Sequence, residues 1–216
     1  KNIEKLSLVN QRITNISPLT DLVKLEYLDL RNNAEGNKVI EDITPLEKLT
    51  SLKTLNLNQS RITNTKPLEK LVNLEHLSLF GTKITTIDFV KNMPNLKYAD
   101  LSYSRLKDIS ALENCKKLET LKLETNKKDN AQGNFERIED ISSLSGLIEL
   151  RELALGNNNI KDIKALKNLK NLTRIELTRN KIDNFEVLLT LPSLNEIFVT
   201  GNDVELDNNI ENFRKA

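Results

Sequence analysis

The stretch LRELALGNNNIKDIKALKNLKN, residues 150–171, contains the pattern that decides the fold. Its Leu-x-x-Leu-x-Leu core returns along the whole chain, usually after 22 residues and twice after longer steps of 27 and 32. The successive cores begin at Ile3, Leu25, Leu52, Leu74, Leu96, Leu118, Leu150, Leu172 and Leu194. Such self-similarity at a fixed period predicts a solenoid in which each repeat stacks on the next.

Apolar side chains also recur at fixed positions after each core. If the first Leu or Ile is position one, positions eleven, fourteen, seventeen and twenty are apolar in nearly every repeat. Stacked coils bury one continuous core only when these columns agree. Thr65 and Asp207, both at position fourteen, are the exceptions. We therefore expect residues 1–216 to form a single domain of about nine repeats and, because both ends fall at repeat boundaries, to be part of a longer protein.

Two local patterns predict how one repeat folds. The Leu-x-Leu stretch alternates apolar and polar residues, which is typical of a half-buried strand. Return segments such as TPLEKLTS, residues 44–51, space apolar residues three apart and carry an early proline, which favours short 3-10 or α turns. The predicted fold class is an α/β solenoid, a leucine-rich-repeat right-handed superhelix. A curved parallel sheet would lie on its concave face, and the short turns on its convex face.

A polar column at position nine interrupts the apolar pattern. It consists of Gln11, Asn33, Ser60, Thr82, Ser104, Asn126, Asn158, Asn180 and Asn202. Buried polar groups need hydrogen-bond partners. We therefore expect these amides and hydroxyls to bond the backbone of the adjacent coil, as a structural ladder and not a binding site.

Composition narrows the possible partners. Charged residues make up 29% of the chain with a formal net charge of +1, and both signs are interleaved, so no nucleic-acid partner is expected. No apolar run approaches the roughly 18 residues that span a bilayer, which predicts no membrane insertion. Cys115 and Met93 both fall at position twenty, which predicts a packing role for each.

The string LxxLxLxxNxIxDIxxLxxLxxL, seen at residues 150–171, resembles the short 22-residue repeats of bacterial internalin-like proteins. The IEDI and IKDI tetrads at residues 40–43, 138–141 and 160–163 are its most specific parts. The resemblance covers the whole chain. It implies a secreted or cell-surface bacterial protein whose concave face holds a host protein or another protein ligand.

Positions three, five, seven and eight point away from the core, so they line the concave face. Aromatic residues gather there although the chain has only three Tyr, six Phe and no Trp. Interfaces favour aromatic residues and Arg at their centres. The alternative is that these are ordinary exposed aromatics stacked along the strands. The predicted partner-binding residues are Tyr27, Asp29, Arg31, Asn56, His76, Phe80, Tyr98, Asp100 and Tyr103, with Asn58 and Ser78 as polar neighbours.

The same columns become mostly charged further along the chain. Opposite charges on adjacent strands can pair for roughly 0.2–1 kcal/mol each, which explains these residues without a ligand. We therefore expect a solvated rim in this half. Its members are Lys122, Glu124, Glu152, Arg174, Glu176, Arg179 and Glu196.

Two repeats carry insertions between the strand and position eleven, within residues 32–39 and 126–137. Insertions in solenoids often serve binding, but surface loops also tolerate extra length at small entropic cost, and both interpretations remain open. The stretch DNAQGN, residues 129–134, lacks the ligand spacing of a calcium-binding EF-hand loop, so no metal site is predicted. The residues that would form a second lip are Glu35, Asn37, Lys128, Asn130 and Phe135.

Catalysis is not expected, and neither is a cofactor. His76 is the only His, and the six Gly are scattered singly, so neither a triad with a second histidine nor a phosphate-cradling loop is available. We predict a monomeric module that binds a protein ligand. The alternatives are an intracellular, cytoplasmic scaffold or phosphatase-regulatory-type subunit with the same repeat, and a passive structural stalk.

Overall fold

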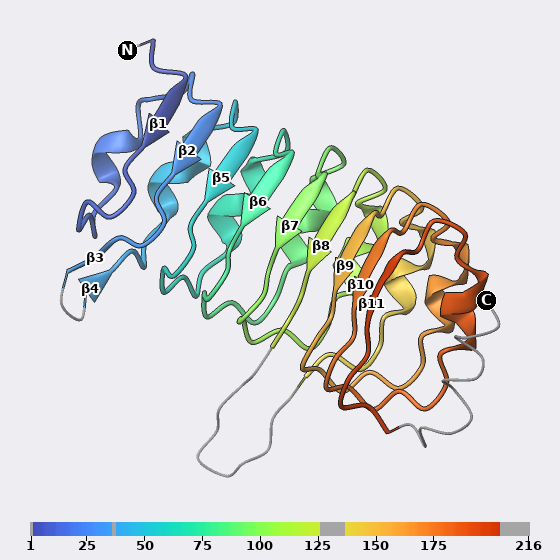
Figure 1. Cartoon of the computed structure of the whole chain (residues 1–216). Coiled ribbons are helices and arrows are strands. Elements are labelled where there is room, and N and C mark those ends of the chain that lie inside the picture. The colour runs from blue at the N-terminus through green and yellow to red at the C-terminus, as the bar shows by residue number, and fades with distance from the viewer. Residues whose placement is uncertain (1, 36–37, 126–136, 204–216) are drawn as a thin grey trace.

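The computed structural model describes residues 2–35, 38–125 and 137–203. Within these residues, nine three-residue strands form one parallel sheet in the order β1-β2-β5-β6-β7-β8-β9-β10-β11 (Figure 1). Their bounds are β1 Lys5–Ser7, β2 Tyr27–Asp29, β5 Thr54–Asn56, β6 His76–Ser78, β7 Tyr98–Asp100, β8 Thr120–Lys122, β9 Glu152–Ala154, β10 Arg174–Glu176 and β11 Glu196–Phe198.

The strands pair in phase, so each residue faces the same repeat position in the next coil. Leu28 in β2 aligns with Leu55 in β5, and Leu55 aligns with Leu77 in β6. These position-four side chains are fully buried and form one line beneath the sheet. The predicted register of the repeats is therefore confirmed, and the residues on either side of position four are left on the opposite face.

Short 3-10 helices lie behind the sheet, one per coil (Figure 1). Within the described residues all helices are of the 3-10 type and none is an α-helix. Each is only three to five residues long, a length typical of 3-10 turns. Pro18, Pro45 and Pro67 each stand in the first turn of such a helix, as predicted. The helices are η1 Ser17–Leu19, η2 Thr44–Lys48, η3 Lys66–Lys70, η4 Asp88–Asn92, η5 Ser110–Asn114, η6 Ser142–Gly146, η7 Lys164–Asn168 and η8 Glu186–Thr190.

The core fills the space between the sheet and these turns. Met93 and Cys115 are buried in it, and burial raises the pKa of the Cys115 thiol to about 11, so this thiol is protonated and unreactive. Thr65, an exception to the apolar pattern, is half-buried, and Asp207 lies outside the described residues. Leu6 and Ile197, in the first and last strands of the sheet, are only partly buried because each has a described coil on one side alone.

The position-nine ladder forms as predicted where the residue is Asn. The Asn180 amide donates to the carbonyl oxygens of Leu177 in its own coil and Leu155 in the preceding coil, and its Oδ1 accepts from the Ile160 N–H. Ser60 and Thr82 differ, because each hydroxyl donates to the carbonyl three residues back in its own coil. The Thr82 hydroxyl also lies 3.4 Å from the Ser104 hydroxyl of the next coil and links the two coils through side chains. Neither hydroxyl bonds the backbone of a neighbouring coil, so the prediction was wrong for these two residues. Asn126 lies outside the described residues.

The first insertion folds into an antiparallel hairpin of β3 Ala34–Glu35 and β4 Lys38–Val39. The predicted lip residue Glu35 pairs with Lys38 across this hairpin through its backbone. The other predicted lip residues, Asn37, Lys128, Asn130 and Phe135, lie outside the described residues. The second lip therefore remains a prediction.

Candidate protein-binding face

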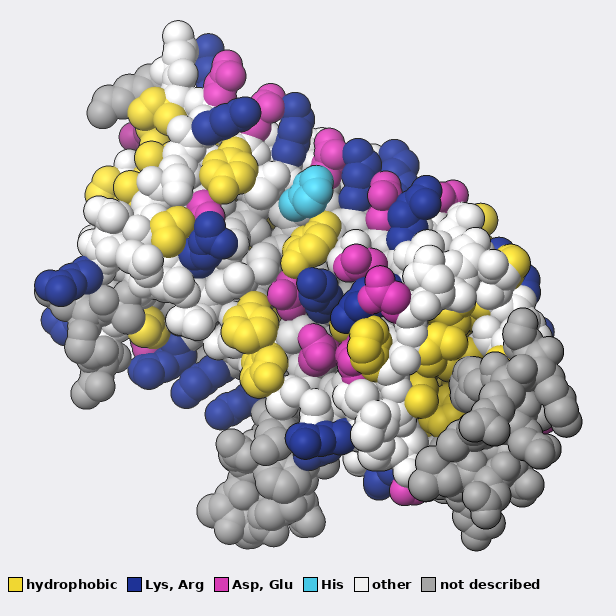
Figure 2. Space-filling model, viewed as in Figure 1, with side chains coloured by type: hydrophobic (Ala, Val, Ile, Leu, Met, Phe, Trp, Pro, Cys, Tyr) yellow, Lys and Arg dark blue, Asp and Glu magenta, His cyan; other side chains and the backbone are white. Residues whose placement is uncertain are grey.

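The sheet side of the solenoid presents the side chains at positions three, five, seven and eight (Figure 2). Aromatic side chains and the single histidine lie over β2 to β7, whereas oppositely charged side chains cluster over the following strands (Figure 2). Phe80 and Tyr98 are half-buried on this side, and Tyr103 is 53% exposed. We call the residues Tyr27, His76, Phe80, Tyr98 and Tyr103 the aromatic face.

Four of these rings form two pairs across neighbouring coils. The His76 and Tyr98 rings stack with centroids 6.2 Å apart and an interplanar angle of 25°. The Phe80 and Tyr103 rings are tilted at 49° with centroids 4.9 Å apart. Both separations fall in the range preferred by aromatic pairs. The pairs hold large, rigid surfaces toward solvent, which lowers the entropy lost when another molecule docks.

Asp29 does not belong to the exposed surface on which the sequence placed it. It is only 2% exposed, because Arg31 and Tyr27 cover it. Its carboxylate lies 3.3 Å from the Arg31 Nε and accepts hydrogen bonds from the Arg31 N–H and the Tyr27 hydroxyl. A buried carboxylate with three such contacts positions its neighbours, so Asp29 orients Tyr27 and Arg31.

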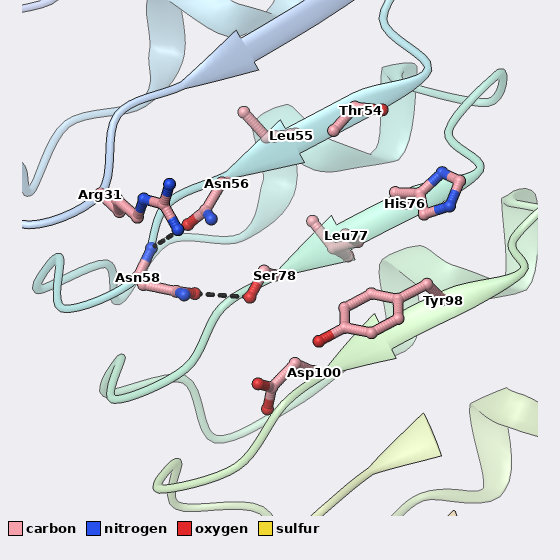
Figure 3. Close-up of a pocket in the computed structure, with 10 residues that line it drawn as sticks. All are labelled: Arg31, Thr54, Leu55, Asn56, Asn58, His76, Leu77, Ser78, Tyr98 and Asp100. Carbon is pink, nitrogen blue, oxygen red and sulfur yellow. Dashed lines mark hydrogen bonds between the residues drawn. The ribbon is translucent and has the colours of Figure 1, made fainter. Parts of the chain in front are cut away.

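The polar residues at position five share a structural role. Asn56 accepts a hydrogen bond from the Asn58 N–H at 3.0 Å, and Asp100 accepts one from the Ser102 N–H at 3.1 Å. Asn58 in turn accepts from the Ser78 hydroxyl at 2.7 Å (Figure 3). The same Asn58 oxygen accepts from the Phe80 N–H at 2.9 Å. The Asn58 side chain thus fixes the backbone that carries Phe80. These side chains are held rigidly before any partner arrives.

An open hollow of about 370 Å³ lies over β5, β6 and β7 (Figure 3). The Tyr98 hydroxyl points toward this hollow, and within the described residues it has no hydrogen-bond partner (Figure 3). Burial, followed by the charges of Asp100 and Glu152, raises the pKa of Tyr98, so the phenol stays neutral and can donate. The hollow is therefore lined by the Tyr98 ring, by its unpaired hydroxyl and by the cationic side chain of Arg31. The sequence did not single out Thr54, which also lines it at position three, beside His76 on the next strand.

Position eight is left-handed in every coil, which explains how it aims side chains outward. The φ angles range from 50° at Thr125 to 76° at Gly201, and Tyr103 has 56°. Asn and Gly tolerate this conformation well, whereas a bulky side chain is strained in it. Packing therefore does not call for a tyrosine at position 103.

In the charged half of the sheet, over β8 to β11, Arg174 is held by its neighbours and acidic side chains lie close together. The Arg174 guanidinium forms an ion pair with Glu196 and lies 4.5 Å from the centroid of the Phe198 ring. Burial, and next the charge of Glu176, raises the pKa of Glu124. The hollow in this half, which Arg174, Glu124 and Glu176 help to line, measures only about 130 Å³. This arrangement fits the predicted rim.

Larger hollows exist on the other side of the molecule but have a simpler explanation. One of about 610 Å³ lies between the exposed turns around η7 and η8, where the Lys161 Nζ approaches Asp183 at 3.7 Å. It is a gap between ionic surface turns and has no ring or buried polar group. We therefore place the candidate site on the sheet.

Neither a metal-binding cluster nor a membrane-spanning helix is found among the residues that the structure describes. Among residues 2–35, 38–125 and 137–203, no group of three or more His, Cys, Asp or Glu side chains could hold a metal ion. No helix in the same residues is long and apolar enough to cross a membrane.

Comparison with known proteins agrees with the repeat geometry. A family model for Leucine Rich repeats (2 copies) matches residues 1–48, 50–92 and 148–189, which is more than half of the chain. The structure of an internalin (InlF) from Listeria monocytogenes superposes with a TM-score of 0.81 at 30% identity, covering 92% of this chain and 54% of that one. The chain is an internalin-like protein of the leucine-rich-repeat family.

Other leucine-rich-repeat structures match by fold alone. InlJ from Listeria monocytogenes gives a TM-score of 0.75 at 23% identity, covering 95% of this chain and 41% of that chain. The ectodomain of the plant receptor kinase GASSHO1/SCHENGEN3 from Arabidopsis thaliana, solved in complex with CASPARIAN STRIP INTEGRITY FACTOR 2, gives 0.77 at 18% identity, with 94% and 25% covered. A search of curated proteins found no match.

This internalin-like chain spans about half the length of the InlF structure and less of InlJ. Leucine-rich-repeat proteins are typically non-enzymatic binding scaffolds, and the fold therefore indicates a protein–protein interaction module.

Proposed function

We propose that this chain is the recognition module of a bacterial secreted or surface protein and that it binds a protein ligand through the aromatic face. The pairing of exposed, pre-organised rings with a hollow that has a free Tyr98 hydroxyl is the observation that carries the proposal. Aromatic side chains are the commonest energetic anchors of protein interfaces. The resemblance to internalins supports the secreted or surface location.

The two halves of the sheet support the choice of face. In the charged half, Arg174 contacts both Glu196 and Phe198 within the solenoid. On the aromatic face, the rings of His76 and Tyr98 contact each other and leave their outer surfaces open to solvent over the hollow (Figure 3). Paired aromatic rings that stay open to solvent beside a hollow favour binding at β2 to β7.

Site-specific photo-crosslinking tests this proposal. A benzophenone amino acid would be placed at Tyr98 on the aromatic face and, as a matched control, at Glu47 on the convex η2 turn, which is exposed. Each protein would be irradiated with detergent-solubilised surface proteins of animal epithelial cells and with the proteins of a bacterial culture supernatant. We expect a discrete protein adduct from Tyr98 and none from Glu47.

The adduct must also depend on the aromatic face. A Phe80→Ala/Tyr98→Ala variant, with the crosslinker moved to His76, should lose about 2 kcal/mol or more of binding energy to the same protein, the typical cost of removing interface anchors. Circular dichroism would establish that the variant is folded. Equal adduct formation from Glu47, or unchanged affinity of the folded double variant, would rule out this face.

A further inference from the structure

A row of cations runs across the coils, in the segments that follow the C-terminal ends of the strands beside the aromatic face. These cations stand at position ten of the repeat, immediately after the ladder residue. The position-ten residues are Arg12, Val39, Arg61, Lys83, Arg105, Arg137, Asn159, Lys181 and Asp203, of which six are cationic in a chain of net charge +1. Figure 2 shows Lys and Arg side chains in this row, beneath the aromatic side chains. We call Arg61, Lys83 and Arg105, from three consecutive coils, the basic edge.

The backbone holds these cations at a regular spacing. The Arg61 N–H donates to the Ile40 carbonyl of the preceding coil at 2.8 Å, and the Arg105 N–H donates to that of Ile84 at 2.9 Å. Coils that are hydrogen-bonded in this way stand about 4.8 Å apart, so the three cations span about 10 Å. The charges therefore form a line along the solenoid axis.

The fold does not use the charges of the basic edge. Within the described part of the chain, the Lys83 and Arg105 side chains make no hydrogen bond or ion pair. Arg61 lies 3.3 Å from Glu41, but both side chains are exposed, and such a pair contributes little. The neighbouring Asp42 and Asp108 carboxylates have a structural role instead: each accepts the N–H of the residue two positions later, which opens a 3-10 turn, and the hydrogen bonds from Thr44 and Ser110 lower their pKa values. Of the three cations only Arg61 has an ionic partner within the described residues, and a row of like charges is unfavourable unless something else neutralises it.

We propose that the basic edge and the adjoining Phe80–Tyr103 ring pair bind an acidic, extended segment of the protein ligand. This inference rests on the proposed function in that the ligand is taken to be a protein. Carboxylates would face Lys83, Arg105 and Arg61, and Arg side chains suit such groups because their planar fork can donate two parallel hydrogen bonds. An apolar side chain of the same segment would lie on the exposed Tyr103 ring, two residues before Arg105.

The charges around the basic edge favour a protein segment over a continuous polyanion. Asp100 and Glu124 lie on the sheet side of the edge, and Asp88 and Asp108 lie on the side of the turns. Carboxylates therefore flank the basic edge on both sides, although Lys91 already pairs with Asp88. A polyanion with charge all along its length would be repelled on both sides, whereas a peptide can place its carboxylates only where the cations stand.

Fluorescence polarisation with a synthetic probe tests the inference. The probe is a short fluorescein-labelled peptide in which Glu alternates with Ser around a central Tyr, and the control probe has Gln in place of Glu. The protein variants are Lys83→Glu/Arg105→Glu and the matched Lys48→Glu/Lys70→Glu, which makes the same change in net charge at exposed residues of η2 and η3 in adjacent coils.

We expect the Glu peptide to bind the unmodified chain and the η2/η3 variant alike. Binding to the Lys83→Glu/Arg105→Glu variant should be weaker by about tenfold or more, and the difference should shrink as salt screens the charges. The inference is overturned if the Glu peptide shows no saturable binding, if the Gln peptide binds equally well, or if the edge variant keeps full affinity. Tighter capture of a sulfated heparin fragment or a single-stranded oligonucleotide than of the Glu peptide would also overturn it, in favour of a polyanion.

A result that disproves binding by the basic edge can be told apart from one that disproves binding by the aromatic face. The Lys83→Glu/Arg105→Glu substitutions leave Tyr98 and its hollow untouched. If this variant retains the Tyr98 photo-adduct at full yield, the aromatic face stands and the basic edge falls. If the adduct requires neither Phe80 nor Tyr98, the aromatic face falls whatever the peptide does.

Discussion

The aromatic half and the charged half of the sheet are built on one scaffold but present different side chains to solvent. Strands β2, β5, β6 and β7 and strands β8 to β11 pair in the same register over one apolar core. In the charged half, Arg174 is occupied by Glu196 and Phe198. In the aromatic half, Tyr98 and Tyr103 keep surface open to solvent. Every coil thus contributes to stability, whereas binding is proposed only for the coils that carry the aromatic face.

The largest expected effects test whether the scaffold is the same in both halves. Leu77 in β6 and Leu153 in β9 occupy the same repeat position and are 0% and 1% exposed. Leu→Ala at either site should lower the free energy of unfolding by about 2–5 kcal/mol, because each leaves a cavity in a close-packed core. Urea denaturation measures this. The Leu6→Ala substitution in partly buried β1 should cost clearly less, and a cost in β6 that differs greatly from that in β9 would contradict a common scaffold.

A smaller effect should distinguish the halves through the position-nine ladder. Asn180→Ala leaves the Ile160 N–H and the Leu155 carbonyl without their side-chain partner, and should cost about 2–3 kcal/mol. Ser60→Ala removes a bond within one coil and should cost about 1 kcal/mol. Urea denaturation of each single variant measures the loss in the free energy of unfolding. Equal costs would mean that bonding between coils adds nothing to the ladder.

Position eight provides a comparison of opposite sign. Arg179, in the charged half, and Tyr103, on the aromatic face, have φ angles of 52° and 56°. Arg179→Asn should raise the free energy of unfolding by about 0.5–1 kcal/mol, because Asn tolerates this conformation better. Tyr103→Asn should raise it less, because the contact with Phe80 is lost as well. Thermal unfolding of the two variants gives the comparison, and destabilisation by Arg179→Asn would contradict it.

The smallest effect concerns Glu124 at the start of the charged half. Its pKa is raised in the folded protein, so the folded state holds this proton to higher pH than the unfolded chain does. The stability that the proton contributes is therefore lost as the pH rises through the folded pKa. Solvent screens this partly exposed group, so Glu124→Gln should raise the Tm by only about 1–2 °C at about pH 7 and by less at about pH 4. A Tm difference that is independent of pH would remove Glu124 from the account.

The sequence predicted what depends on period and left out what depends on side-chain length and neighbours. Regular spacing was enough to assign the strands, the buried columns and the outward positions of Phe80 and Tyr98. It did not reveal that Asp29 is covered, because this depends on how Tyr27 and Arg31 fold back over it. It also predicted that the Ser60 and Thr82 hydroxyls bond the backbone of the adjacent coil, whereas each donates to a carbonyl of its own coil.

The ring pairs and the basic edge are two further features that the repeat pattern alone did not predict. Phe80 is at position seven of one coil and Tyr103 at position eight of the next, so their contact runs diagonally and appears in no single column. Position ten was visible in the sequence, but its significance depends on knowing which charges are already paired. The Asp42 and Asp108 carboxylates have partners and the Lys83 ammonium has none in the described residues, a distinction that spacing alone cannot make.

Oxidative footprinting of the complex with the photo-crosslinked protein tests the central claim most directly. Hydroxyl radicals label exposed aromatic side chains, and Phe198, 39% exposed in the charged half, is an internal reference for Tyr98 and Tyr103. The account predicts strong protection of Tyr98 and Tyr103 on binding and no change at Phe198. Protection of Phe198 with Tyr98 and Tyr103 still labelled would contradict it.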